Sequence, residues 1–230
     1  MGMIKDWICD WNAEPDLKQI VEKTLALFGV FTGATLSFYV KDFVFGANIP
    51  AGFRDFSFWG RLLVAVSVIA LLLRYIIGSA VHLNATYVPK VTTKLGPVDG
   101  NGEQALIEEK QVKSKSLRLL IFDIAMLVAF GILAVSIIYS VDFDEFLVYS
   151  SFYILAGLLW SLAALMWRPG DAPIAERWSV LDFSQLVLTL GLFEISWSDF
   201  TRAALLAPLY VFCLFLDLCV VSRPAPTPPA

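Results

Sequence analysis

The stretch Arg74-Tyr-Ile-Ile-Gly78-Ser-Ala-Val-His82-Leu-Asn84 closes a long apolar run that begins near Phe58. A helix needs about 20 mostly apolar residues to cross a lipid bilayer, and this run is long enough. An arginine lies inside the run, and the only histidine of the chain lies at its end. Because a charge in the hydrocarbon interior is costly, we expect Arg74 to face other helices and to have a polar partner there.

The composition of the whole chain also indicates a membrane protein. Of the 230 residues, 58% are hydrophobic and only 17% are charged, whereas soluble domains carry about 25% charged residues. The net charge of −4 argues against a nucleic-acid partner, since phosphate binding needs a dense basic patch. Three cysteines without zinc spacing and a single histidine do not make a metal site. We therefore expect no metal and no cofactor.

Five further segments have the length or the hydropathy of membrane spans. They are residues 24–45, 117–140, 146–167, 180–195 and 203–222. The segment 180–195 is short and carries Asp182, Gln185 and Glu194, so it either spans or lies in the interface. The predicted fold class is all-α: a polytopic membrane helix bundle with about six transmembrane helices.

The chain divides into three parts by composition. Residues 1–23 predict an N-terminal amphipathic helix at the membrane surface, because Ile4, Trp7, Ile8 and Trp11 share one helical face. An ordinary amphipathic helix packed on its own protein explains this face equally well. Residues 24–222 form the predicted bundle with a polar loop over 83–117, in which residues 103–115 favour a helix. Residues 223–230 are a Pro-rich tail that we expect to be disordered.

The distribution of basic residues predicts the orientation. One side of a six-span bundle would hold the following basic residues: Lys5, Lys18, Lys23, Lys90, Lys94, Lys110, Lys113, Lys115, Arg118, Arg168, Arg177 and Arg223. The other side would hold only Lys41, Arg54, Arg61 and Arg202. By the positive-inside rule, both termini are cytoplasmic. Together with short loops, this suits a plasma membrane, most simply a bacterial inner membrane.

Small and polar residues mark the faces that should pack against helices or line a pore. Gly29 and Gly33 are one turn apart and allow close helix approach, within the chain or in self-association. On the second span, Ser67, Arg74, Gly78 and His82 fall on one face. Polar faces of the later spans add Gln185 and Thr189 beside Asp182, and Tyr210 and Cys213 beside Asp217.

Four charged residues are expected to form an intramembrane polar cluster: Arg74, Asp123, Asp182 and Asp217. Arg74 and Asp123 lie at comparable depth on spans joined by one loop, so Asp123 is the first predicted partner of Arg74. Asp182 and Asp217 could form a proton- or cation-responsive pair, since two carboxylates in low dielectric share a proton or recruit a cation. The alternative is that both are hydrated near the interface.

No nucleophile–base constellation or nucleotide-binding motif occurs in the sequence, so no catalytic residue is predicted. The small residues and polar faces favour a non-enzymatic, oligomeric channel or pore-forming membrane effector. A cytosolic protein could then act on the loop 83–117. An accessory or structural subunit of a membrane complex, or a small secondary transporter, are the alternatives.

Overall fold

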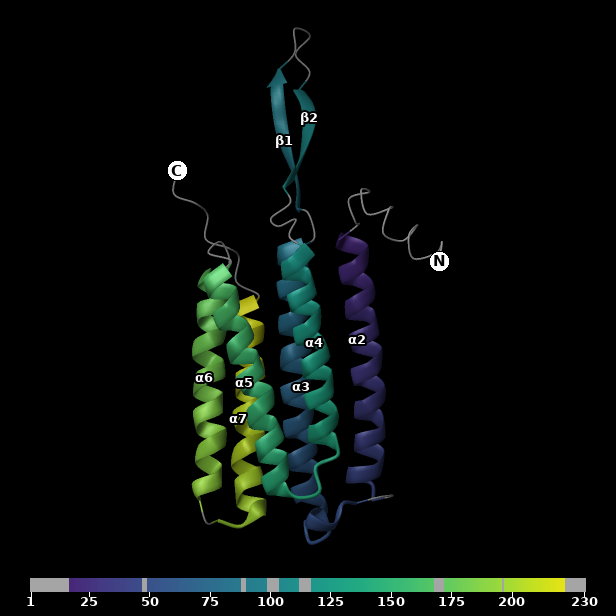
Figure 1. Cartoon of the computed structure of the whole chain (residues 1–230), viewed down its shortest axis with the longest axis vertical. Coiled ribbons are helices and arrows are strands. Elements are labelled where there is room, and N and C mark those ends of the chain that lie inside the picture. The colour runs from purple at the N-terminus through teal and green to yellow at the C-terminus, as the bar shows by residue number, and fades with distance from the viewer. Residues whose placement is uncertain are drawn as a thin grey trace, which may run out of the picture.

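The protein is a bundle of long, roughly parallel or antiparallel helices, with a β-hairpin at one end (Figure 1). The computed structural model describes residues 17–46, 49–87, 90–98, 104–111, 117–167, 172–195 and 197–221. The helices are α2 (Leu17–Tyr39), α3 (Phe58–Tyr87), α4 (Leu117–Ile138), α5 (Phe143–Trp167), α6 (Ala172–Glu194) and α7 (Asp199–Val221). The predicted surface helix over 1–23 lies outside the described residues up to position 16, and residues 17–23 are the first turns of α2. The predicted tail over 223–230 also lies outside them.

Four helices are long and apolar enough to cross a membrane. Their candidate spans are Phe58–Asn84, Leu119–Ile138, Phe143–Met166 and Asp199–Cys219, which belong to α3, α4, α5 and α7. Helices α2 and α6 have 23 residues each but are not among the four. Lys18, Glu22 and Lys23 lower the hydropathy of α2, and several charged residues lower that of α6. The membrane-helix class is thus confirmed, while the number of six spans stays a prediction.

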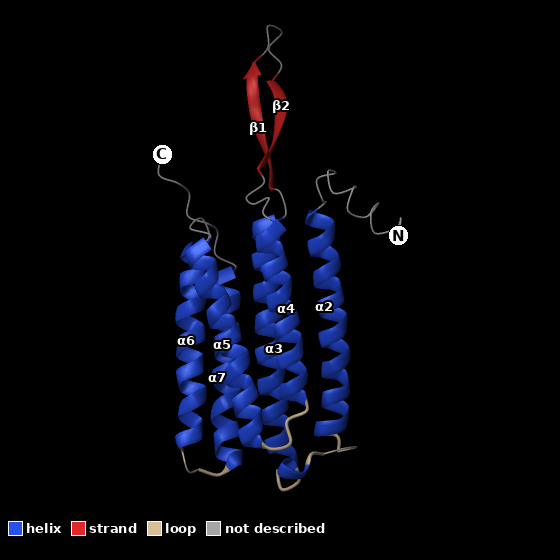
Figure 2. Cartoon of the chain, viewed as in Figure 1, coloured by secondary structure: helices blue, strands red, loops and turns tan. Residues whose placement is uncertain are grey.

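The connection between α3 and α4 contains a strand where the sequence predicted a helix. Strands β1 (Lys90–Val98) and β2 (Gln104–Gln111) pair antiparallel and stand beyond the ends of α3 and α4 (Figure 2). The prediction of a helix over 103–115 is therefore wrong. It rested on one i,i+4 ion pair, worth only a few tenths of a kcal/mol, whereas cross-strand pairing contributes at each position. The register is irregular between Leu95 and Val98, around Pro97, which has no backbone N–H to donate.

The opposite end of the bundle is closed by short, tightly packed turns. Asp142 precedes α5, and its Oδ1 accepts the backbone N–H of Glu145 at 2.8 Å. The Glu145 carboxylate in turn accepts the N–H of Val141 at 2.6 Å, an arrangement close to a capping box. The backbone N–H of Gly52 also donates to the Val141 carbonyl at 3.0 Å. A Cβ on residue 52 would overlap Asp142, so only glycine fits there.

The bundle has broad apolar areas on its outer surface and buries four charged residues inside: Arg74, Asp123, Asp182 and Asp217. Large exposed side chains include Val128 and Ile132 of α4 and Phe183 of α6, each about 60% exposed. Arg74 and Asp123, in contrast, are 2% and 0% exposed. This is the inverse of a soluble protein surface, and such broad apolar faces need lipid or another protein against them.

Candidate polar site within the helix bundle

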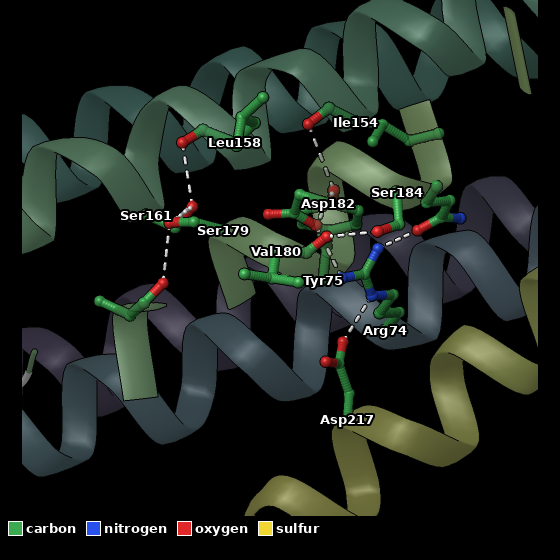
Figure 3. Close-up of polar contacts among 12 residues, drawn as sticks. Arg74, Tyr75, Ile154, Leu158, Ser161, Ser179, Val180, Asp182, Ser184 and Asp217 are labelled. Atoms are coloured by element: carbon green, nitrogen blue, oxygen red, sulfur yellow. Dashed lines mark hydrogen bonds and ion pairs between the residues drawn. The ribbon is translucent and has the colours of Figure 1, made fainter. Parts of the chain in front are cut away.

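Arg74 of α3 lies at the centre of a buried cluster formed with α6 and α7. Its Nε donates to Asp217 Oδ2 at 2.5 Å, and its Nη2 lies 2.6 Å from Asp182 Oδ1. Its Nη1 donates to the Gln185 side-chain oxygen. Figure 3 shows the guanidinium between the carboxylates of α6 and α7. Each of these four residues is at most 4% exposed.

The helical repeat places these partners. Asp182, Gln185 and Thr189 lie on one face of α6, and all three are buried. Tyr210 and Cys213, on the same face of α7 as Asp217, are buried too. The Thr189 and Tyr210 hydroxyls are hydrogen-bonded at 3.3 Å further along the two helices. The polar faces of α6 and α7 thus point toward each other, and Arg74 of α3 bonds to both.

Tyr75 adds a second donor to the Asp182 carboxylate. Its hydroxyl donates to Asp182 Oδ1 at 3.0 Å, so this oxygen receives both Tyr75 and Arg74. The Tyr75 ring packs directly on Gly157 of α5, where a Cβ would overlap the ring atoms. Tyr75 was not predicted as a site residue, because an apolar run gives no sign that its tyrosine hydroxyl bonds to a carboxylate inside the bundle.

Asp123 belongs to a neighbouring cluster and does not bind Arg74. Its two oxygens accept hydrogen bonds from Tyr87 Oη at 2.7 Å and Trp160 Nε1 at 2.8 Å. The predicted Arg74–Asp123 ion pair is therefore wrong. Similar depth on consecutive spans does not bring Arg74 and Asp123 into contact, because the Arg74 side chain points toward α6 and α7.

His82 lies between the two clusters. Its Nε2 is 3.7 Å from Asp123 Oδ2, and its ring packs edge-on against Trp160 with centroids 4.9 Å apart. Trp178 of α6 lies on another side at 6.3 Å. No group of three or more potential ligands that could hold a metal ion occurs among the described residues.

A small cavity separates the Arg74 cluster from the aromatic groups around His82. It has a volume of about 30 Å³, enough for about two water molecules at about 10–15 Å³ each. The residues that line it include Arg74, His82, Trp160, Trp178, Asp182 and Asp217. Three buried polar atoms of its lining residues have no hydrogen-bond partner among the described residues: Ser79 Oγ, Trp178 Nε1 and Asp217 Oδ1.

The charges of the Arg74 cluster do not balance when all groups are ionised. One guanidinium faces two carboxylates, which leaves a surplus of one negative charge. Net charge in a low-dielectric interior costs several kcal/mol unless a proton, a cation or water compensates it. The arrangement can therefore bind one positive charge or exchange a proton.

The other predicted packing residues behave differently from one another. Ser67 is fully buried and donates to the Leu63 carbonyl at 2.9 Å, and Gly78 lies against Trp178. Gly29 and Gly33 of α2 face away from the bundle, and no other atom comes within 4 Å of the place where a Cβ would be. The small residues of α2 thus do not mediate packing within the described chain.

Fold and site together define the class: a helical membrane protein with a buried arginine–dicarboxylate cluster inside its bundle. Comparisons with protein-family models, curated proteins and solved structures found no match for this chain. Its function must therefore be argued from the site.

Proposed function

We propose that this chain is a subunit of an oligomeric, non-enzymatic membrane channel or pore-forming effector, in which the Arg74 cluster controls ion passage. The carrying observation is the buried set of Arg74, Asp182 and Asp217 beside a cavity of about 30 Å³. Ionisable groups inside membrane bundles are rare, costly and typical of ion pathways. A purely structural bridge would be favoured by balanced charges, and these charges are not balanced.

The proposal places all six helices across a plasma membrane, such as a bacterial inner membrane, with both termini cytoplasmic. Helix α6 supports this placement because it turns Val180, Phe183 and Val187 outward, each at least 50% exposed, while burying Asp182 and Gln185. Helix α2 begins and α7 ends at the hairpin end of the bundle (Figure 1). That end carries most of the basic residues, as the positive-inside rule requires for the cytoplasmic side.

Self-association is part of the proposal, since the cavity inside one chain is far too small for a pore. Gly29 and Gly33 leave a smooth face on α2 that a neighbouring helix could approach. An apolar groove of about 630 Å³ lies between α2 and α4, lined by residues such as Leu27, Val128 and Gly131. A cytosolic partner would act through the hairpin in loop 83–117.

Ion flux into liposomes tests the proposal. We expect purified full-length protein to release potassium or proton gradients, and Asp217→Asn to change the rate several-fold. Asp55→Asn is the matched control, because Asp55 is exposed and lies outside the cluster. A flux that saturates with substrate and follows a coupled gradient would point to a transporter instead.

An accessory subunit of a membrane complex is the second candidate. It is favoured by the hydrogen bonding of Arg74, because each of the three nitrogens of its side chain has a partner. Folded wild-type protein that gives no flux, and that co-purifies with another membrane protein in defined ratio, would replace the channel proposal with this one.

A further inference from the structure

The Arg74 cluster has an unmet requirement for one positive charge. Among the described residues, the titratable groups that face it are Arg74, Tyr75 and His82 on α3, Asp123 on α4, Tyr153 on α5, Asp182 on α6, and Tyr210, Cys213 and Asp217 on α7. Arg74 is the only permanent cation among them. His82 lies nearer to Asp123 than to either carboxylate that Arg74 binds, and its Nε2 is 3.7 Å from Asp123 Oδ2.

The hydrogen bonds within the cluster use only one oxygen of each carboxylate. Asp182 accepts from both Arg74 and Tyr75 through Oδ1, and Asp217 accepts from Arg74 through Oδ2. Asp217 Oδ1 is buried and has no partner among the described residues. A bare carboxylate oxygen in a low-dielectric site is costly, and a proton or a water molecule removes that cost.

The cavity is lined in part by Asp217, the residue that carries this oxygen. It holds about two water molecules by volume, and a buried water needs two to four polar partners. Asp217 Oδ1 can accept from such a water, while the Trp178 indole N–H can donate to it. On the far side the cavity reaches His82 and Trp160, which contact Asp123.

A metal or alkali cation fits the same cavity less well. The guanidinium of Arg74 lines the cavity and would repel any cation placed there. The lining includes more oxygen-bearing side chains than indole and imidazole rings, so the positive charge of Arg74 is what disfavours sodium or potassium there. A proton needs only one carboxylate oxygen and a water to deliver it.

We propose that Asp182 and Asp217 share one exchangeable proton beside Arg74, and that water in the cavity connects this proton to His82 and Asp123. Hydronium gives its proton to the carboxylate pair and leaves as water, and the reverse step returns it. This inference rests on the proposed function, because it names the proton as the ion that the channel conducts. The bound proton can be measured by itself, without a flux measurement.

Infrared difference spectroscopy of the reconstituted full chain tests the proposal. We expect a carboxylic-acid C=O band that shifts in D₂O, which shows an exchangeable proton. Replacing either Asp182 or Asp217 with Asn should remove the band, because Arg74 then balances the single remaining carboxylate. Asp123→Asn tests whether the band belongs to the neighbouring cluster instead. Asp55→Asn is the control at an exposed carboxylate outside both clusters, and it should leave the band.

Three results would overturn the proposal: no such band in wild type, a band that survives in both Asn variants, or a band lost only in Asp123→Asn. Absence of the band together with measured binding of sodium or potassium to the cluster would likewise overturn the proposal. Tyr75→Phe guards against misfolded variants, since it keeps the ring and both carboxylates and removes only a hydroxyl, which bonds to Asp182 and more weakly to the Ile154 carbonyl oxygen. That variant should keep the band but shift its frequency, and an unshifted band would count against the assignment.

The two proposals fail separately. A wild-type band without liposome flux leaves the bound proton standing and contradicts the channel. Flux without a band that depends on Asp182 and Asp217 leaves the channel standing and contradicts the bound proton. A pH-sensitive dye inside the liposomes records the flux, and the infrared band is recorded on the same preparation.

Discussion

At the residue scale, Arg74 of α3 joins α6 and α7 through buried polar contacts. It is 2% exposed and binds carboxylates from two helices. The ionised groups gain little net stability as a set, because burial cancels much of their attraction. Removing one member is different, since the others remain buried without compensation.

Arg74→Gln should lower the free energy of unfolding by about 3–5 kcal/mol, the usual cost of breaking a buried ion pair from one side. The measurement is reversible unfolding in detergent micelles. Arg54→Gln is the control, because Arg54 is exposed in a turn and should change stability by less than about 0.5 kcal/mol. Equal stability of the two variants would show that Arg74 has no paired role.

Gly157→Ala should destabilise the protein by about 1–3 kcal/mol, as overpacking does, because its Cβ would overlap the Tyr75 ring. Gly131→Ala on α4 is the matched control. No atom lies within 4 Å of the Cβ position there, so alanine should be neutral or stabilise by about 0.5–1 kcal/mol. Both changes are read from the same unfolding experiment, and the same sign for both would contradict the packing of Tyr75.

At the element scale, the helices form where the sequence is apolar, and their ends depend on local polar groups. Four of the six helices, α3, α4, α5 and α7, begin and end within about five residues of the predicted spans, because hydropathy and turn formers act locally. Helices α2 and α6 start earlier, at Leu17 and Ala172, because their first two turns carry charged residues. The hairpin could not be anticipated in the same way, since β1 and β2 stabilise each other across a turn.

Asp142→Ala should cost about 1 kcal/mol, in the range for a lost N-cap, because the N–H of Glu145 loses its acceptor. Thermal unfolding monitored by circular dichroism gives the change. Asp55→Ala is the matched surface control and should leave the midpoint unchanged. A similar shift in both variants would mean that the cap does not stabilise α5.

At the scale of the whole molecule, the orientation can be measured directly. A variant with Cys9, Cys213 and Cys219 replaced by Ser would carry single cysteines at Thr93 in β1 or at Trp197 in the opposite turn. With both termini cytoplasmic, an impermeant maleimide added outside cells should label position 197 and leave position 93 unlabelled. Labelling of position 93 from outside would invert the proposed topology.

The sequence by itself determined that this is a helical membrane protein. Apolar runs and the 3.6-residue repeat are local properties, so Arg74, Asp182 and Asp217 could be assigned to polar helix faces without coordinates, while the burial of both aspartates stayed open. Only the tertiary structure decided which of these faces meet. Arg74 pairs with Asp182 and Asp217 and not with Asp123, because α3, α6 and α7 converge there although residues 74 and 217 are 143 positions apart. The cavity beside them is likewise a property of packing, and no local pattern encodes it.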